Sequence, residues 1–129
     1  MPDTEKITIN MSVVDLGQVD LLVEEGFYSS RTDFIRTAIR NQINQHGEAV
    51  RQSVTRNTMA MGATGYTRAD LEKCRVKGEK LNIRVVGLFM LSNDVTPDLA
   101  RDTIESVKVL GVFRASEAVK AALADRIVS

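Results

Sequence analysis

The stretch Lys6–Arg40, KITINMSVVDLGQVDLLVEEGFYSSRTDFIRTAIR, decides how the rest of the chain is interpreted. It opens with six residues in which apolar and polar side chains alternate, as on a strand with one apolar face. The apolar ones are Ile7, Ile9 and Met11, and the polar ones are Lys6, Thr8 and Asn10. No second strand is near enough in sequence to pair with this run. Its partner is therefore expected in a second copy of the chain.

Two paired strands of this kind form a ribbon with a polar outer face. That face carries Lys6, Thr8 and Asn10, small or flexible hydrogen-bonding side chains that fit base edges in a DNA major groove. By donor and acceptor geometry, Lys6 favours guanine and Asn10 favours adenine. The same residues are also consistent with a solvated strand face that binds nothing.

Capping signals predict two short helices after this run. Asp15 is the predicted N-cap of the first helix, with Gln18 as its capping-box partner, and Gly26 suits its end. Ser30 is the predicted N-cap of the second helix, with Asp33 three residues on. The second helix is expected to stop near residues 46–47.

The start of the second helix combines free backbone N–H groups with serine hydroxyls and Arg31. Helix N-termini attract anions because the first N–H groups have no partner within the helix and the helix dipole is positive there. A phosphate of the DNA backbone is the anion that we expect at this position.

The run Val19–Arg40, VDLLVEEGFYSSRTDFIRTAIR, resembles the ribbon-helix-helix DNA-binding proteins of bacteria. Thr32 and Asp33 replace the Ser and Glu that are usual in that family, and the resemblance covers about residues 5–45. It implies an intertwined dimer whose paired strands enter the major groove of double-stranded DNA. The residues that match its base-reading positions are Lys6, Thr8 and Asn10, and those that match its phosphate-anchoring positions are Ser29, Ser30, Arg31 and Thr32.

The last third of the chain contains a repeat with a period of 24 residues, which relates Ile83–Ser92 to Val107–Ser116. Each copy predicts a strand followed by a capped helix, and this order implies parallel strands with right-handed crossovers. Only two copies are recognised, whereas a solenoid needs about three to bury a core. We therefore expect the strand edges to meet another subunit or a protein partner. A small stand-alone α/β sensor domain is the alternative.

The predicted fold class is mixed α/β, with a ribbon-helix-helix unit followed by a small β-α-β-α module with parallel strands. The predicted domains are residues 1–46 for DNA binding, 47–66 as a linker, and 67–129 for oligomerisation or partner docking. A helix from Ala49 to Met61 is the alternative to a flexible linker.

Charge is distributed unevenly along a chain whose net charge is zero. Residues 1–50 carry four Lys or Arg against eight Asp or Glu, and residues 51–80 carry seven against three. An acidic first segment counts against a nucleic-acid binder, which normally has a basic surface. The basic middle segment is either a solvated face or an auxiliary phosphate contact.

The residue types present argue against catalysis and against a bound metal or cofactor. The chain has one histidine and one cysteine, His46 and Cys74, in separate segments, and no glycine-rich phosphate loop. No apolar run reaches the roughly 20 residues of a membrane span. The single cysteine fits a reducing cytoplasm.

Two function classes remain, and a third is weaker. The first is a dimeric, sequence-specific transcriptional regulator that represses by occupying its operator. The second is an antitoxin whose C-terminal part masks a toxin; such tails are commonly disordered until bound, whereas the repeat in this chain predicts a folded module. The third is a structural oligomer in which the ribbon only dimerises.

Overall fold

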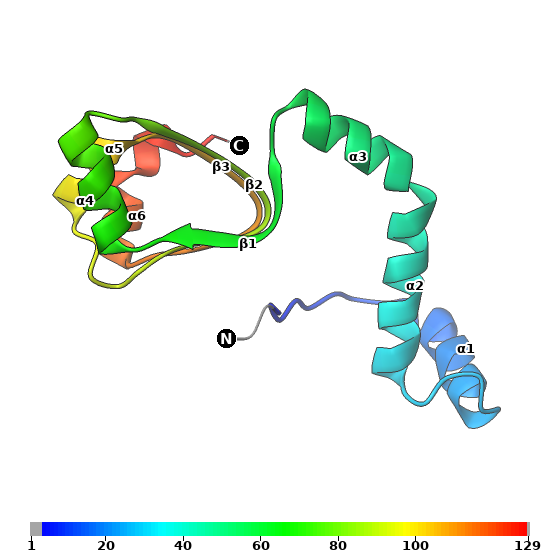
Figure 1. Ribbon diagram of the computed structural model, residues 1–129. Helices are drawn as coiled ribbons and strands as arrows, with labels where there is room; N and C mark the ends of the chain where they lie inside the picture. Colours follow the sequence, from blue (N-terminus) through cyan, green and yellow to red (C-terminus); the bar gives the residue numbers. More distant parts are fainter. Residues whose placement is uncertain (1–3, 129) are drawn as a thin grey trace. The chain divides into compact units, whose positions relative to one another are not determined.

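The computed structural model describes residues 4–128, which form two compact units. One unit comprises Lys6–Ser53, and the other comprises the residues from Val54 onward together with Thr4 and Glu5. The mixed α/β class predicted from the sequence is confirmed, with helices in both units and a sheet in the second (Figure 1). Among the described residues, no helix has the length and apolar character needed to cross a membrane.

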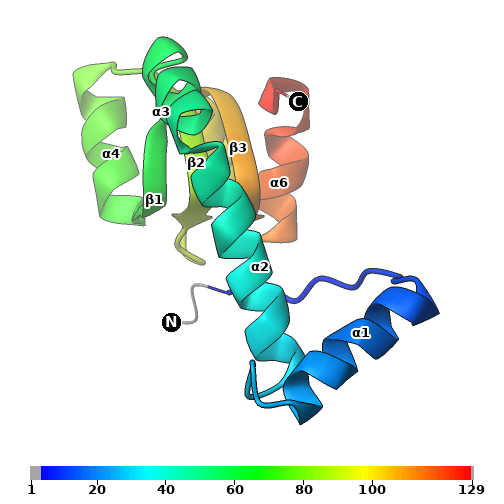
Figure 2. The same cartoon turned by 90° about the vertical axis from the view of Figure 1, so that its right-hand side faces the viewer.

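The Lys6–Ser53 unit begins with two helices joined by a short turn (Figure 2). Helix α1 spans Val13–Glu24, and its N-cap is Ser12, whose hydroxyl accepts a hydrogen bond from the backbone N–H of Asp15 at 3.5 Å. The prediction of Asp15 as N-cap was therefore wrong. The helix begins about one turn earlier, because the Ser12 hydroxyl supplies the capping oxygen. Gly26 has the left-handed conformation expected after the helix, with φ of 86°.

Helix α2 spans Arg31–Gln45 and begins as predicted. The Ser30 hydroxyl accepts from the backbone N–H of Asp33 at 3.0 Å, which confirms the N-cap. The Asp33 carboxylate reaches back to Ser29 rather than to Ser30, so the reciprocal bond is shifted by one residue. The helix ends at Gln45 with His46 as its C-cap, in agreement with the prediction.

Packing within this unit is sparse. Val19 of α1 is the one fully buried side chain among its residues, with 3% of its surface exposed. The rings of Tyr28 and Phe34 meet edge to face at a centroid distance of 4.9 Å. Such a pair adds about 0.5–1.5 kcal/mol beyond the area that it buries, which is little for a unit with one buried residue.

The predicted linker, residues 47–66, is largely regular structure instead. Helix α3 spans Gly47–Arg56, and strand β1 spans Ala60–Tyr66. The division between the two units falls inside α3, between Ser53 and Val54. Part of the helical alternative that the sequence offered for this segment is therefore present.

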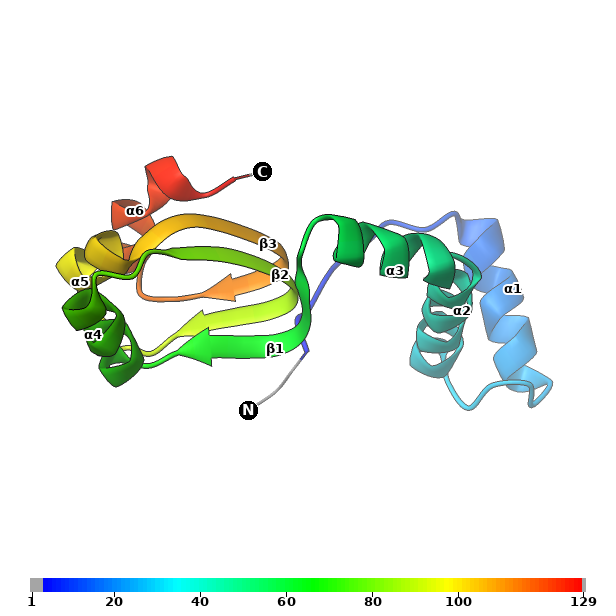
Figure 3. The ribbon, with the colours of Figure 1, turned by 45° about the horizontal axis from the view of Figure 1, so that its top comes forward.

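The second unit is built on a three-stranded parallel sheet with the order β1-β2-β3 (Figure 3). Strand β2 spans Leu81–Leu91 and strand β3 spans Ile104–Arg114. The parallel arrangement predicted from the repeat is confirmed. The helices that follow the strands are α4 (Arg68–Lys77), α5 (Pro97–Thr103) and α6 (Glu117–Ala122), and a 3-10 turn follows at Ala124–Arg126.

The sheet shows that the repeat has three copies rather than two. The copy missed in the sequence is β1, which pairs with β2 over its whole length and is followed by the capping-box helix α4. Each strand is thus followed by a capped helix, with Thr67, Thr96 and Ser116 as the three N-caps. Three copies meet the number that a solenoid needs to bury a continuous core.

Glycines at one level of the sheet allow all three strands to bend. Gly62, Gly87 and Gly111 are in register, with φ values of 126°, 134° and 126°. A Cβ atom on Gly87 would lie 2.3 Å from the carbonyl oxygen of Gly62, and one on Gly111 would lie 2.1 Å from that of Gly87. Only glycine tolerates this backbone conformation and this close approach together. In Figure 1 the strands turn at the end of the unit opposite to α4, α5 and α6.

The hydrophobic core is formed by residues of the bent strands and of the three helices α4, α5 and α6. Alternate residues of β2 face it, and Leu88 is buried as well, outside this cluster. Phe89 and Leu71 are fully buried, and Tyr66 and Phe113 pack their rings against Phe89 at centroid distances of 6.0 and 5.5 Å. The other core members include Ile83, Val85, Leu99, Val107, Val119 and Leu123.

The outer edge of β3 is covered at one point. Ile127 forms a parallel bridge with Val107, and the backbone N–H of Val128 donates to the Val107 carbonyl at 2.7 Å. Helix α6 ends at Ala122, and after the 3-10 turn the chain pairs with the sheet at Ile127. The remainder of the β3 edge, up to Arg114, has no strand beside it among the described residues.

Candidate nucleic-acid interface

The predicted base-reading residues lie on an extended segment. Lys6, Thr8 and Asn10 are all exposed, and no strand forms between residues 4 and 12 in the single chain. The apolar residues between them are uncovered as well, with exposed fractions of 74% for Ile7 and 65% for Ile9. The apolar and the polar side chains of the segment are thus both open to solvent.

The predicted phosphate-anchoring residues gather at the start of α2. Ser29, Ser30, Arg31 and Thr32 are exposed there. The backbone N–H and the hydroxyl of Ser29 both donate to the Asp33 carboxylate, at 3.0 and 3.2 Å. The helix start therefore already holds an anionic group from its own first turn. The N–H groups of Arg31 and Thr32, at the first two helical positions, have no acceptor within the helix.

Arg31 has a partner that the sequence did not reveal. Its guanidinium makes two hydrogen bonds to the Asp20 carboxylate, from Nε at 2.7 Å and from an Nη atom at 2.8 Å. These hydrogen bonds hold the pKa of Asp20 below its ordinary value and raise the pKa of Arg31. The bidentate pair fixes the guanidinium at the N-terminus of α2.

Several basic side chains of residues 51–80 have partners within the second unit. Arg68 and Arg75 both contact Glu72, at 3.1 and 3.9 Å, and Arg75 also contacts Asp102 at 3.5 Å. Lys80 donates to the backbone carbonyl of Asp102 at 2.7 Å. Arg68 and Arg75 thus already have carboxylate partners within the chain, which favours a solvated face over a phosphate contact there.

Sequence reasoning missed a hollow in the second unit beside the ends of its strands. Arg114 and Lys120 line it, together with residues that follow β1 and β2. The feature of the sequence that would have indicated this hollow is the threefold repeat, because parallel strands in register end at one edge of the sheet. With β1 unrecognised, that edge was incomplete. Within residues 4–128 no three His, Cys, Asp or Glu side chains come together as metal ligands would.

Comparison with known proteins places this arrangement in a family. The model of the Ribbon-Helix-Helix transcriptional regulator family matches residues 2–120. The match extends well beyond residues 5–45, where the sequence resemblance was recognised, and includes α3 and all three strands. Searches of curated proteins and of solved structures found no match. The chain belongs to the Ribbon-Helix-Helix transcriptional regulator family, whose members are DNA-binding regulators.

Proposed function

We propose that the chain is a dimeric, sequence-specific repressor that inserts a two-stranded ribbon into the major groove of double-stranded DNA. Residues 6–11 of two copies pair as antiparallel strands to form this ribbon. The protein acts in the cytoplasm by occupying its operator, without catalysis and without a cofactor.

The observation that carries the proposal is the uncovered apolar surface of the Lys6–Ser53 unit. Its exposed large apolar side chains are Ile7, Ile9, Met11, Val13, Val14, Leu21, Phe27, Ile39 and Ile43, and only Val19 is fully buried. A folded unit of this size needs more buried surface than one side chain supplies. A second copy placed on this surface would bury it.

Pairing of residues 6–11 would give each strand a buried apolar face and an exposed polar face. Ile7, Ile9 and Met11 would then lie against the helices of the dimer. Lys6, Thr8 and Asn10 would point away from the helices towards the bases. Lysine donates to guanine, asparagine binds adenine with both amide atoms, and threonine contacts either a base or a thymine methyl group.

The start of α2 would anchor the ribbon to the phosphate backbone. Ser29, Ser30, Arg31 and Thr32 supply hydroxyls, backbone N–H groups and one guanidinium. Arginine has five N–H donors, and the pairing with Asp20 uses two of them, so the guanidinium retains donors for a phosphate while its position is fixed.

The experiment is fluorescence anisotropy with duplex DNA from the upstream region of the gene, measured over a series of salt concentrations. The variant Lys6→Ala/Thr8→Ala/Asn10→Ala is expected to lose at least about a hundredfold in preference for the specific duplex over random DNA. The wild-type protein is expected to bind more weakly as salt rises, because phosphate contacts release counterions.

The matched control is Lys77→Ala, which removes one exposed positive charge from α4. It should keep the sequence preference of the wild type. If the triple variant keeps that preference as well, the ribbon does not read bases. If no duplex binds at low salt, the segment serves only to dimerise the chain.

A further inference from the structure

A cavity of about 790 Å³ lies at the carboxyl ends of the three parallel strands of the second unit. It is lined by the last residues of β1, β2 and β3 and by residues of the connections that follow them. Ligands of parallel α/β sheets bind at this edge, where loops and helix starts supply polar groups. The volume falls within the range of about 300–1,000 Å³ that is typical of small-molecule sites.

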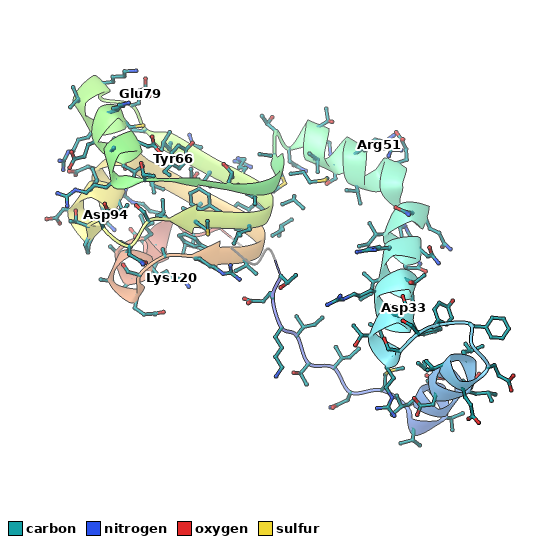
Figure 4. All side chains as sticks on the ribbon, turned by 60° about the horizontal axis from the view of Figure 1, so that its bottom comes forward. Asp33, Arg51, Tyr66, Glu79, Asp94 and Lys120 are labelled. Carbon is teal, nitrogen blue, oxygen red and sulfur yellow. The ribbon has the colours of Figure 1, made fainter. Side chains whose placement is uncertain are left out.

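The lining of the cavity combines an apolar floor with hydrogen-bonding groups. Leu88 and Met90 supply apolar surface, while Tyr66 and Asn93 supply a hydroxyl and an amide group. The Ser92 hydroxyl already donates to the Asp94 carboxylate and accepts from the backbone N–H of Arg68. Apolar surface with a few convergent polar groups is the usual character of a site for a small organic molecule. Figure 4 shows Tyr66 and Lys120, which come from β1 and α6 of this unit.

The charge of the lining has one sign. Arg114, at the end of β3, and Lys120, on α6, are both part of it, and none of the lining residues that the structure shows is Asp or Glu. Lys120 lies with its Nζ atom 5.9 Å from the centroid of the Phe113 ring. Two cations beside an apolar floor favour a ligand with an anionic group and an apolar part.

Arg114 is also in contact with the segment that precedes Lys6. An Nη atom of Arg114 donates to the Thr4 carbonyl at 3.2 Å and lies 3.5 Å from the Glu5 carboxylate. The Glu5 side chain is 54% exposed. An ion pair that is so open to water contributes little to stability. An anion in the cavity would therefore compete with Glu5 for the same guanidinium.

We propose that this cavity binds a small amphipathic organic anion, a carboxylate or a phosphate monoester with an apolar part, through Arg114 and Lys120. Binding competes with the contact between Arg114 and Glu5. Because Glu5 directly precedes Lys6, the ligand changes how firmly the start of the extended segment is held. Ligand binding itself does not require DNA and is tested without it.

The test uses the full-length protein and the fluorescent anion 8-anilinonaphthalene-1-sulfonate. Its neutral counterpart N-phenyl-1-naphthylamine reports binding to apolar surface alone. The variants Arg114→Met and Lys120→Met each remove one cation of the cavity, and Lys108→Met removes a cation of β3 that does not line it. Circular dichroism establishes that each variant is folded.

Arg114→Met and Lys120→Met are each expected to weaken binding of the sulfonate about tenfold, the loss of one charge-assisted hydrogen bond. Lys108→Met should bind as the wild type does, and none of the three should change binding of the neutral probe. Glu5→Gln should tighten binding of the sulfonate about two- to fivefold, because it removes the competing carboxylate.

Competition experiments identify the headgroup and complete the test. Octanoate and octyl phosphate should both displace the sulfonate, and the stronger competitor shows whether the site prefers a carboxylate or a phosphate. Octanol should displace it far less well. Equal displacement by octanol, or equal affinity of Lys120→Met and Lys108→Met for the sulfonate, overturns the proposal. If Arg114→Met does not fold, the Lys120→Met and Glu5→Gln results decide.

Discussion

Two glycines of the sheet show how strongly a single residue is constrained by its neighbours. Gly87 and Gly111 each combine a positive φ with a carbonyl oxygen of the preceding strand where a Cβ atom would lie. Gly17 differs from both, because it lies within α1 and a Cβ atom there would meet nothing within 4 Å. The same substitution should therefore have opposite effects at the two kinds of position.

Gly87→Ala is expected to destabilise the second unit by about 3 kcal/mol or more, because the backbone must shift as well as adopt a strained φ. Gly17→Ala is the control, expected to stabilise the first unit by about 0.5–1 kcal/mol through helix propensity. Urea unfolding at one protein concentration measures both. A Gly87→Ala protein as stable as the wild type would mean that the bend relaxes without cost.

Local residue roles could be predicted from the sequence, and long-range roles could not. Ser30 was identified as an N-cap because the capping oxygen and its N–H lie three residues apart. Where two capping residues compete, as Ser12 and Asp15 do, the spacing alone did not decide. The pairing of Arg31 with Asp20 joins residues in different helices, and no local pattern encodes it.

At the scale of elements, the pair of Asp20 and Arg31 joins α1 to the start of α2. Hydrogen bonding to Arg31 lowers the pKa of Asp20 in the folded protein. This contribution to stability is therefore present above the unfolded pKa of about 3.9 and is lost as the pH falls through the lower folded value. We expect the stability of the first unit to decline below about pH 4.

Asp20→Asn should reduce that decline, because the group that titrates is absent. Arg31→Gln should reduce it to a similar extent, since it removes the partner that shifts the pKa. Urea unfolding at neutral pH and at about pH 3 measures the difference for each protein. Equal declines in the wild type and in Asp20→Asn would show that this pair does not link the helices thermodynamically.

Element prediction succeeded where a strand is rich in β-branched and aromatic residues and failed where it consists mostly of small, exposed ones. Strands β2 and β3 were recognised from their β-branched and aromatic residues. Strand β1, AMGATGY, consists mostly of small residues and was assigned to a linker. Gly65 shows why such residues occur there, since a Cβ atom on it would lie 2.3 Å from the Met90 carbonyl oxygen. At Gly65, therefore, the close approach of the neighbouring backbone, which the sequence does not show, requires glycine.

At the scale of the whole molecule, the uncovered face of α2 predicts association. Ile39 and Ile43 are one helical turn apart and are 47% and 55% exposed. Ile39→Asp/Ile43→Asp should weaken the dimer at least about a hundredfold, because a carboxylate buried without a partner is strongly unfavourable. Light scattering after size exclusion should then give the monomer mass of 14.2 kDa at micromolar concentration.

Val76→Asp is the control for this prediction. Val76 lies on α4 of the other unit and is 88% exposed, so a carboxylate there is solvated in any assembly that leaves α4 open. This variant should remain dimeric. A dimeric Ile39→Asp/Ile43→Asp protein would show that the two chains associate through other surfaces.

The stacked glycines also restrict how the length of this chain can change over evolution or by engineering. An insertion of one residue within a strand would move its glycine out of line with the neighbouring carbonyl, and that strand would lose register with the strands beside it. An insertion of a whole strand-and-helix repeat, 24 or 25 residues long, would keep each bend aligned. Viable variants of this unit should therefore differ in length by complete repeats, or within the connections, where an insertion does not change the register of the strands.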